Sequence, residues 1–294
     1  MNWPTNCVRP QEPLSSHTSF RIGGPAEWYA EPQSIDELLA VLREARRAGL
    51  PVSAIGGGTN LLVADRGVRG LVLRLGAGFR QVTVDSPEDA NEAVVRCGAS
   101  VMTQRLVGLA SQHGWAGLEL MAGLPGQVGG AVTMNAQNIG TFVEAVTVVT
   151  FDGNVKQIPK ERLLFTYRYA AIDPGIVVEV ALKFPKAADR ESTYGIQEAL
   201  CYRNTTQDLR LPSAGCAFKN PKGQSAGKLI DQTGLKGQRI GDAQVSLRHA
   251  NFIVNVGQAS CDDVLSLMEH IQRRVRSAHG LWLEPEFRVL GERL

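Results

Sequence analysis

The sequence predicts an α+β protein of 294 residues, long enough for two or three domains. Three observations predict this fold class. Amphipathic helical patterns and short apolar strand patterns both occur along the whole chain. Glycine-rich loops and turn pairs separate these patterns. The stretch 185–190 combines proline with charged residues and is typical of a linker before a last domain.

The first part of the chain, residues 1–75, predicts one helix followed by strands. Ser34 and Glu37 form a capping-box pattern at the start of the helix, and Gly49 ends it. Apolar segments then predict strands at 51–55, 61–63 and 70–75.

The second part, residues 76–187, predicts strands around one helix. We expect Ser100 to cap a helix that ends at Gly114, and a glycine-studded loop at 123–130. Asp152-Gly153 is a turn pair that suits a hairpin. The predicted strands are 93–97, 143–151, 155–158 and 176–184.

The third part, residues 188–294, predicts three helices and two strands. Ser260 and Asp263 form a capping-box pattern for a long amphipathic helix that Gly280 ends. In the final strand the alternation predicts one apolar face and one polar face. Leu281, Leu283, Phe287 and Val289 point one way, and Glu284, Glu286 and Arg288 share the other face. The remaining predicted elements are helices at 193–202 and 225–233 and a strand at 250–256.

Composition excludes several function classes. The net charge is +2 with no basic block, so we expect no nucleic-acid partner. No apolar run reaches the roughly 18 residues of a membrane span, and the N-terminus does not read as a signal peptide. The five scattered cysteines include no C-x-x-C pair, so we expect reduced thiols, no metal site and a cytoplasmic location.

Two glycine clusters predict ligand contact. Gly56-Gly57-Gly58-Thr59-Asn60 follows an apolar strand, and its N–H groups can turn toward a phosphate; the alternative is a plain tight turn. Neither the dinucleotide fingerprint nor the Walker loop is present. The second cluster runs from Gly123 to Ala131 and could lie along a flat ligand, or could be a packed glycine crossing. Together the two clusters could hold one long ligand, such as a dinucleotide, from two sides.

Three reactive side chains complete the candidate site. Cys216 lies among small residues near Lys219, which suits a proton donor or nucleophile, although most lone cysteines are small buried hydrophobes. Arg168 follows an aromatic stretch, and Glu286 follows Pro285 near the chain end. Each of these two could be a surface salt-bridge residue. A thiol, a guanidinium and a carboxylate brought together would suit chemistry beside a carboxylate or a developing enolate.

Read in order, these segments resemble the UDP-N-acetylenolpyruvoylglucosamine reductases, flavoenzymes of bacterial peptidoglycan synthesis. The resemblance covers the chain from about residue 18 to its end, and the set is specific because the segments occur in the family's order. The matching segments are Thr18 to Gly24, Gly56 to Leu62, Gly123 to Ala136, Tyr167-Arg168, Gly215 to Pro221, Ala226 to Ile230, His249 to Asn255 and Leu283 to Glu286.

The resemblance implies a two-part FAD-binding domain of the vanillyl-alcohol-oxidase type, a separate α+β substrate domain, and a C-terminal tail that returns to the active site. It implies that NADPH reduces FAD and that hydride then passes to the enolpyruvyl double bond of UDP-N-acetylglucosamine enolpyruvate, giving UDP-N-acetylmuramate. Arg168 and Glu286 would stabilise the enolate-like intermediate, and Cys216 would protonate it. Tyr167, Lys219 and Asn220 would contact the substrate. The implied cofactor positions are Gly56, Gly57, Gly58, Thr59, Asn60, Leu61, Gly123, Gly126, Gly129, Gly130, Ala131 and Asn135.

The chain departs from the family pattern at three places. Cys216 stands where serine is common, and a thiol is the stronger acid but is oxidisable. Gln137-Asn138-Ile139-Gly140 replaces an expected Gly-Ala-Tyr-Gly, and Ala170 replaces a usual serine. The length between Phe184 and Cys216 indicates the shorter type of the family, and we expect a monomer. The alternative functions are an FAD-dependent oxidase of the same fold and a non-catalytic flavin or nucleotide-sugar binding module.

Overall fold

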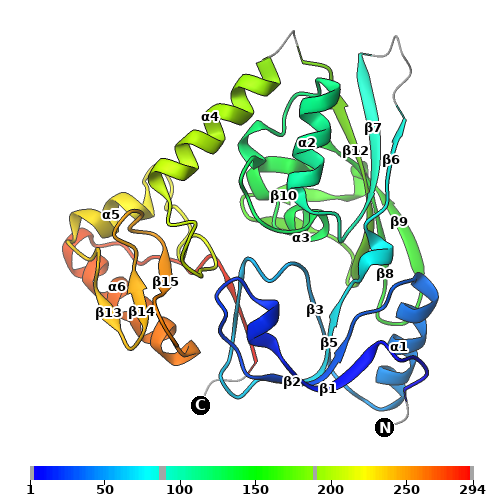
Figure 1. The fold of residues 1–294 in the computed structure, drawn as a ribbon, viewed down its shortest axis with the longest axis horizontal. Helices are drawn as coiled ribbons and strands as arrows, with labels where there is room; N and C mark the ends of the chain where they lie inside the picture. Colours follow the sequence, from blue (N-terminus) through cyan, green and yellow to red (C-terminus); the bar gives the residue numbers. More distant parts are fainter. Residues whose placement is uncertain (1–2, 86–90, 188–190, 292–294) are drawn as a thin grey trace. The chain divides into compact units, whose positions relative to one another are not determined.

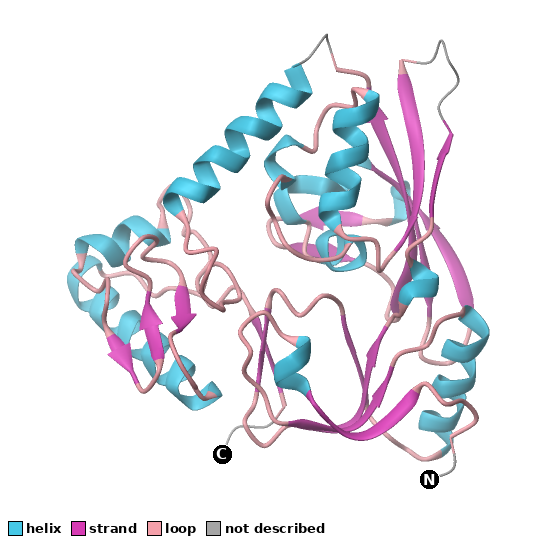
Figure 2. Cartoon of the chain, viewed as in Figure 1, coloured by secondary structure: helices cyan, strands magenta, loops and turns pink. Residues whose placement is uncertain are grey.

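The structure is a computed structural model that describes residues 3–85, 91–187 and 191–291. Helices and strands are interspersed along the chain, which confirms the mixed α+β prediction (Figures 1 and 2). Residues 188–190 of the expected linker lie outside the described residues. The chain forms two compact units. Unit 1 comprises Met1–Arg9, Tyr29–Gly57 and Gly70–Tyr202, and unit 2 comprises Pro10–Trp28, Gly58–Arg69 and Arg203–Leu294.

A five-stranded antiparallel sheet is the framework of unit 1, in the order β6-β7-β12-β8-β9. Its strands are β6 (Val82–Asp85), β7 (Glu92–Gly98), β8 (Val143–Val149), β9 (Val155–Pro159) and β12 (Ile176–Pro185). The last four confirm predicted strands within a residue or two. Strand β6 was not predicted; its residues after Val82 are all exposed. The predicted hairpin is β8–β9, which turns through Asp152-Gly153.

The apolar core of unit 1 covers this sheet with helices and large aromatic side chains. Trp115 is fully buried and stacks on Phe184 of β12, with ring centroids 5.9 Å apart. The helices of the unit are α1 (Ile35–Arg47), α2 (Thr103–His113), α3 (Val128–Thr133) and α4 (Glu191–Thr206), although α4 belongs to unit 2 from Arg203 onward. Burial of these apolar side chains supplies the main stabilising free energy of the unit.

Two details in this region correct the predictions. The N-cap of α2 is Met102, whereas Ser100 is buried and its hydroxyl donates to the carbonyl of Leu75. A buried hydroxyl satisfied by a tertiary acceptor is not available to the helix. The predicted loop 123–130 also contains the start of α3, because residues from Val128 onward are helical.

Other strands of the chain form two smaller sheets. β1 (Val8–Pro13), β2 (Pro25–Ala30), β5 (Val68–Arg74) and β3 (Val52–Ile55) form a four-stranded sheet in that order, with β3 and β5 parallel. The predicted start of α1 is confirmed, since Ser34 accepts a hydrogen bond from the Glu37 N–H. Strands β10 (Leu164–Thr166) and β11 (Tyr169–Ala171) form a short hairpin in unit 1.

Unit 2 is built around one long helix. Helix α6 (Cys261–His279) buries Leu267, Ile271 and Val275 among the side chains of a small sheet and of a second, shorter helix. The other elements are α5 (Ala226–Gln232), the antiparallel strands β13 (Arg239–Ile240), β14 (Ala243–Val245) and β15 (Ile253–Asn255), and the parallel pair β4 (Leu61–Val63) and β16 (Arg288–Leu290).

The final segment only partly follows its predicted alternation. Leu283 and Phe287 are buried, and Leu281 packs against the core. Val289 was predicted to share their face and is instead 42% exposed. Val289 belongs to β16, which pairs in parallel with β4. Leu283 lies outside this strand, so the side chains around Leu283 and those of β16 do not follow one continuous alternation.

The N-terminus of α6 has two sources of hydrogen-bond acceptors. Ser260 and Asp263 form the predicted capping box. In addition, the Asp65 carboxylate accepts from the N–H groups of Cys261 at 2.8 Å and Asp262 at 3.2 Å. A carboxylate at this position satisfies helix donors that have no intrahelical partner and interacts favourably with the helix dipole.

We predict that Asp65→Ala lowers the free energy of unfolding by about 1–2 kcal/mol, as expected when a charged capping residue is removed. Urea unfolding followed by circular dichroism measures the change. Asp262→Ala is the matched control, because it removes one negative charge from the same first turn without removing those two bonds. Equal losses in the two variants would show that Asp65 acts only through its charge.

Candidate active site

In unit 2 the Cys216 segment lies between two other stretches of backbone. Cys216 pairs with Phe252, and Phe218 pairs with Pro285, each as an antiparallel bridge. The Ala217 N–H donates to the carbonyl of Asn251 at 2.7 Å, and the Ala217 carbonyl accepts from the Glu286 N–H at 2.9 Å. The structure therefore brings the predicted thiol and the predicted carboxylate onto adjacent backbone segments.

A single buried amide fixes the register of this arrangement. Asn251 is 2% exposed, and its Oδ1 accepts from the Phe218 N–H at 3.0 Å. Its Nδ2 donates to the Phe218 carbonyl at 2.8 Å. Because one side chain satisfies both backbone groups of one residue, a shift of the segment along its neighbour would leave buried polar groups unpaired.

Asn60 connects the first glycine cluster to the C-terminal tail. Its Nδ2 donates to the Glu286 carbonyl at 3.4 Å, and its own carbonyl accepts from the Arg288 N–H at 3.1 Å. The next residue, Leu61, pairs with Arg288 in the parallel β4–β16 ladder. The tail that carries Glu286 is thus held beside the loop that was predicted to contact the cofactor.

The cysteines differ in accessibility, and Cys216 is not one of the buried ones. Cys97 and Cys261 are buried, whereas Cys216 is half-buried. Burial raises the pKa of the Cys97 thiol to about 12, as expected of a structural cysteine in an apolar sheet. The partial exposure of Cys216 is compatible with contact between its thiol and a ligand, which full burial would prevent.

The two predicted substrate residues that follow Cys216 also make contacts within unit 2. Lys219 Nζ lies 3.4 Å from Glu284 Oε2 in an exposed ion pair, which contributes little to stability and can be exchanged for a ligand. Asn220 Oδ1 accepts from the Ala226 N–H at 3.0 Å, at the start of α5.

Close packing explains why the third residue of the first cluster is glycine. Gly58 has a φ of +67° and is buried, and a Cβ at this position would collide with the carbonyl of His17. Its own carbonyl accepts from the Ser19 N–H at 3.0 Å. Glycine is therefore required at 58 by the backbone it touches, and Thr59 beside it is half-buried.

In unit 1 the first two glycines of this cluster face the second cluster. A Cβ on Gly57 would lie 3.4 Å from the Cα of Gly126, and one on Gly56 would lie 3.5 Å from Oε1 of Gln127. Gln127 is buried, and its Nε2 has no hydrogen-bond partner among the described residues. Two glycine backbones and an unsatisfied amide donor make a narrow surface that fits a flat group rich in acceptor atoms, as FAD is.

The remaining glycines of the second cluster divide into two kinds. A Cβ on Gly129 would lie 2.8 Å from Cβ of Ala99, and the Gly129 N–H donates to the Ala99 carbonyl at 2.9 Å. Gly129 therefore packs α3 against the end of β7. Gly130 is exposed, and a Cβ there would meet nothing within 4 Å, so its backbone is open to a ligand. Gly123 donates its N–H to Gln104 Oε1, and Ala131 is buried in α3.

Tyr167 and Arg168 form the two-residue tip of the β10–β11 hairpin in unit 1. Thr166 pairs with Tyr169 on either side of them. Tyr167 is 55% exposed, and the guanidinium carbon of Arg168 lies 5.5 Å from the centre of its ring. Arg168 has a φ of +59°, a left-handed conformation that arginine rarely adopts. Such backbone strain occurs most often at functional positions.

Asn135, one of the predicted cofactor residues, uses its side chain within the protein. It is 7% exposed; its Nδ2 donates to the Thr166 carbonyl, and its Oδ1 accepts from the Gly140 N–H. Gln137 and Asn138, where the expected family pattern has Gly-Ala, both have positive φ values of 49° and 60°. The departure from the family pattern therefore occurs in backbone that would favour glycine.

Two residues that sequence reasoning missed stand out. Gln127 is the only polar side chain in the second glycine cluster, and Asn251 lies within the matched segment His249 to Asn255; both could have been singled out as polar residues in apolar surroundings. His249 in the same segment packs against Phe252, with ring centroids 4.5 Å apart, and burial lowers the pKa of its imidazole.

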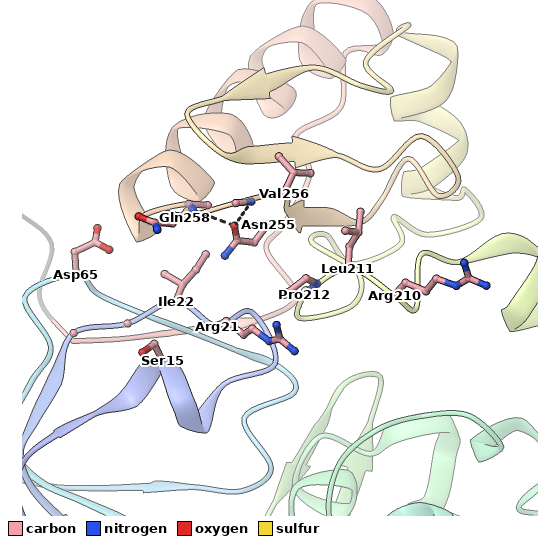
Figure 3. Close-up of a pocket in the computed structure, with 14 residues that line it drawn as sticks. Ser15, Arg21, Ile22, Asp65, Arg210, Leu211, Pro212, Asn255, Val256 and Gln258 are labelled. Atoms are coloured by element: carbon pink, nitrogen blue, oxygen red, sulfur yellow. Dashed lines mark hydrogen bonds between the residues drawn. The ribbon is translucent and has the colours of Figure 1, made fainter.

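A separate cavity of about 600 Å³ in unit 2 contains none of the predicted site residues (Figure 3). Arg21, Asp65 and Asn255 are among its lining residues. The Asn255 Oδ1 accepts from the N–H groups of Gly257 and Ala259, so this amide orders the loop that precedes α6. Within the described ranges, no three histidine, cysteine or acidic side chains gather as metal ligands, and no helix has the length and apolar character to span a bilayer.

Two family models match the chain. An FAD binding domain matches residues 26–158, which contain both glycine clusters, and the C-terminal domain of UDP-N-acetylenolpyruvoylglucosamine reductase matches residues 207–290. The second match contains Cys216 and Glu286. The expectation of an FAD-binding domain joined to a substrate domain of this family is confirmed.

Full-length relatives give the same result. UDP-N-acetylenolpyruvoylglucosamine reductase 2 of Symbiobacterium thermophilum is 42% identical over 97% of this chain and 92% of its own length. The reductase of Myxococcus xanthus is also 42% identical, over 97% of this chain and 93% of its own length. The crystal structure of the enzyme from Thermus caldophilus matches with a TM-score of 0.77 and 40% identity, covering 96% of this chain and 98% of that chain. The chain therefore belongs to the UDP-N-acetylenolpyruvoylglucosamine reductase family.

Proposed function

We propose that this protein reduces the enolpyruvyl double bond of UDP-N-acetylglucosamine enolpyruvate with NADPH, through FAD, to form UDP-N-acetylmuramate for peptidoglycan synthesis. The observation that carries the proposal is the backbone pairing that holds Cys216 beside Glu286 within a domain matched to this family. The nucleotide substrate and NADPH are its partners, and we propose that it acts as a monomer without nucleic acid.

The proposed roles follow from the chemistry of each group. When bound, FAD carries hydride from NADPH to the enolpyruvyl carbon. Arg168 would place a fixed positive charge at the substrate carboxylate, where negative charge develops, and Glu286 would act with it to stabilise the enolate-like intermediate. The Cys216 thiol would donate the proton that completes the reduction. Tyr167, Lys219 and Asn220 would contact the nucleotide.

Residues of both glycine clusters would form the surface that contacts FAD. Gly130 would allow FAD to approach the backbone, since a Cβ there would meet nothing within 4 Å, and Gly56 and Gly57 would place their backbone beside the Gln127 side chain. Gln127 would donate from its Nε2 to an acceptor on the cofactor, because this buried donor has no partner among the described residues. We propose that residues 1–75 and 76–187 are the two FAD-binding parts and that residues 188–294 are the substrate domain.

The direct test is spectroscopic and kinetic. The purified protein should be yellow, with the visible absorption of flavin. NADPH added without oxygen should bleach it, and the enolpyruvyl nucleotide should restore the colour. A colourless protein, or one that does not consume NADPH when the enolpyruvyl nucleotide is present, would refute the proposed function.

We predict that Cys216→Ala slows the reduction of the nucleotide by about 10²–10⁴-fold, the usual contribution of a general acid, and leaves the reduction of flavin by NADPH intact. Cys216→Ser should retain activity, because a hydroxyl can replace the thiol as donor. Stopped-flow absorbance measures the two half-reactions separately. Equal loss of both half-reactions in the alanine variant would exclude the proton-donor role.

We predict that Arg168→Gly and Arg168→Ala both lose the reduction of the nucleotide but differ in stability. Both variants delete the guanidinium, yet only alanine retains a Cβ in the left-handed conformation found at this position. The glycine variant should therefore be more stable than the alanine variant by about 1 kcal/mol in thermal or urea unfolding. Equal stabilities would show that the hairpin tip relaxes when the arginine is removed.

A further inference from the structure

The tip of the β10–β11 hairpin has a turn that does not match the twist of its strands. Tyr167 and Arg168 are its two central residues, and of the two only Arg168 has a positive φ. A positive φ at the second central residue alone is the type II pattern, whereas two-residue hairpins favour turns with a positive φ at the first. The tip therefore adopts a turn that the twist of its own strands does not favour.

A contact from outside the hairpin holds the backbone next to this tip. Asn135 lies between α3 and the 3₁₀ segment η4 (Ala136–Phe142), and its own φ of 44° is one that asparagine tolerates. Its Nδ2 donates to the Thr166 carbonyl at 2.9 Å, immediately before the tip. Its Oδ1 accepts from the Gly140 N–H at 3.0 Å, which fixes the orientation of the amide.

A second contact locks the same two elements together. A Cβ on Gly140 would collide with the ring of Phe165, so this ring lies directly against the Gly140 backbone. Phe165 pairs with Ala170 across the hairpin. The segment η4 and the hairpin therefore form one packed body, and the buried amide of Asn135 is its polar link.

We infer that Asn135 is a positioning residue for Arg168: its amide holds the Thr166 carbonyl and thereby aims the guanidinium at the substrate. This inference rests on the proposed function, which gives Arg168 its role at the substrate carboxylate. The sequence-based expectation that Asn135 contacts the cofactor stays a separate prediction.

The chemistry explains why such a residue would be needed. A guanidinium stabilises developing charge only if it is already in place when the charge forms. Misplacement of a reacting or stabilising group by about 1 Å can lower a rate about 10²-fold. Because the twist of the strands does not favour the turn at this tip, a tertiary hydrogen bond next to the tip helps to hold its position.

The test uses Asn135→Asp, which keeps an acceptor for Gly140 but replaces the donor to Thr166 with a carboxylate oxygen. Asn138→Asp is the matched control, because it makes the same chemical change at an exposed residue that also has a left-handed backbone. Asn135→Gly is the second variant if the aspartate variant does not fold, since glycine tolerates the backbone and lacks the amide.

Three measurements are made on the flavin-loaded variants: flavin content, the rate at which the nucleotide reoxidises the flavin, and hydrogen exchange in the peptide that covers 163–172. We expect Asn135→Asp to keep its flavin, to slow the reoxidation at least about tenfold, and to speed exchange in that peptide. In an Arg168→Gly background, Asn135→Asp should change the rate less than about twofold, because its effect passes through the missing guanidinium. The control should match the parent protein.

The outcomes separate the inference from the proposed function. Unchanged exchange in the 163–172 peptide, additive effects of the two substitutions, or loss of flavin with a normal rate after reloading would each overturn the positioning role. If Arg168→Gly alone leaves the reoxidation rate unchanged, the proposed role of Arg168 fails, and faster exchange in Asn135→Asp would still show that the amide holds the hairpin.

Discussion

The buried amide of Asn251 is the interaction on which the reactive end of unit 2 depends. It pairs with both backbone groups of Phe218 and so fixes the Cys216 segment against its neighbour. The segment then presents its other edge to Glu284 and Glu286, whose backbone groups complete the pairing. Cys216 and Glu286 are about 70 residues apart in sequence, and their proximity follows from this register.

The glycines of the two clusters serve different physical purposes that look alike in sequence. Gly58 and Gly129 are required because neighbouring backbone or side chains occupy the place of a Cβ. Gly57 lies against Gly126 of the other cluster, and Gly130 faces open space. A glycine-rich loop thus combines residues selected for packing with residues that expose backbone to a ligand.

Arg168 and Cys216 illustrate two different ways to hold a reactive group. Cys216 lies in an antiparallel bridge, where the hydrogen bonds of the next residue, Ala217, to two flanking segments set its position. Arg168 lies on a short hairpin with a left-handed backbone, where a tertiary contact helps to hold its position. The first arrangement resists displacement by itself, whereas the second depends on a neighbouring segment.

Sequence alone determined the fold class, most helices and strands, and the family, because these depend on local patterns and on the order of motifs. The capping box of α6 and the helix ends at Gly114 and Gly280 were predictable, since capping is a contact between near neighbours in the chain. The tertiary structure decided what local patterns cannot encode. Ser100 bonds to Leu75 instead of capping α2, and Asn135 bonds to Thr166. Val289 lies in β16 and is exposed, unlike Leu283 and Phe287. For Ser100 and Asn135 a buried polar group must be paired wherever its partner lies, and for Val289 the pairing of β16 with the distant strand β4 overrides the local alternation.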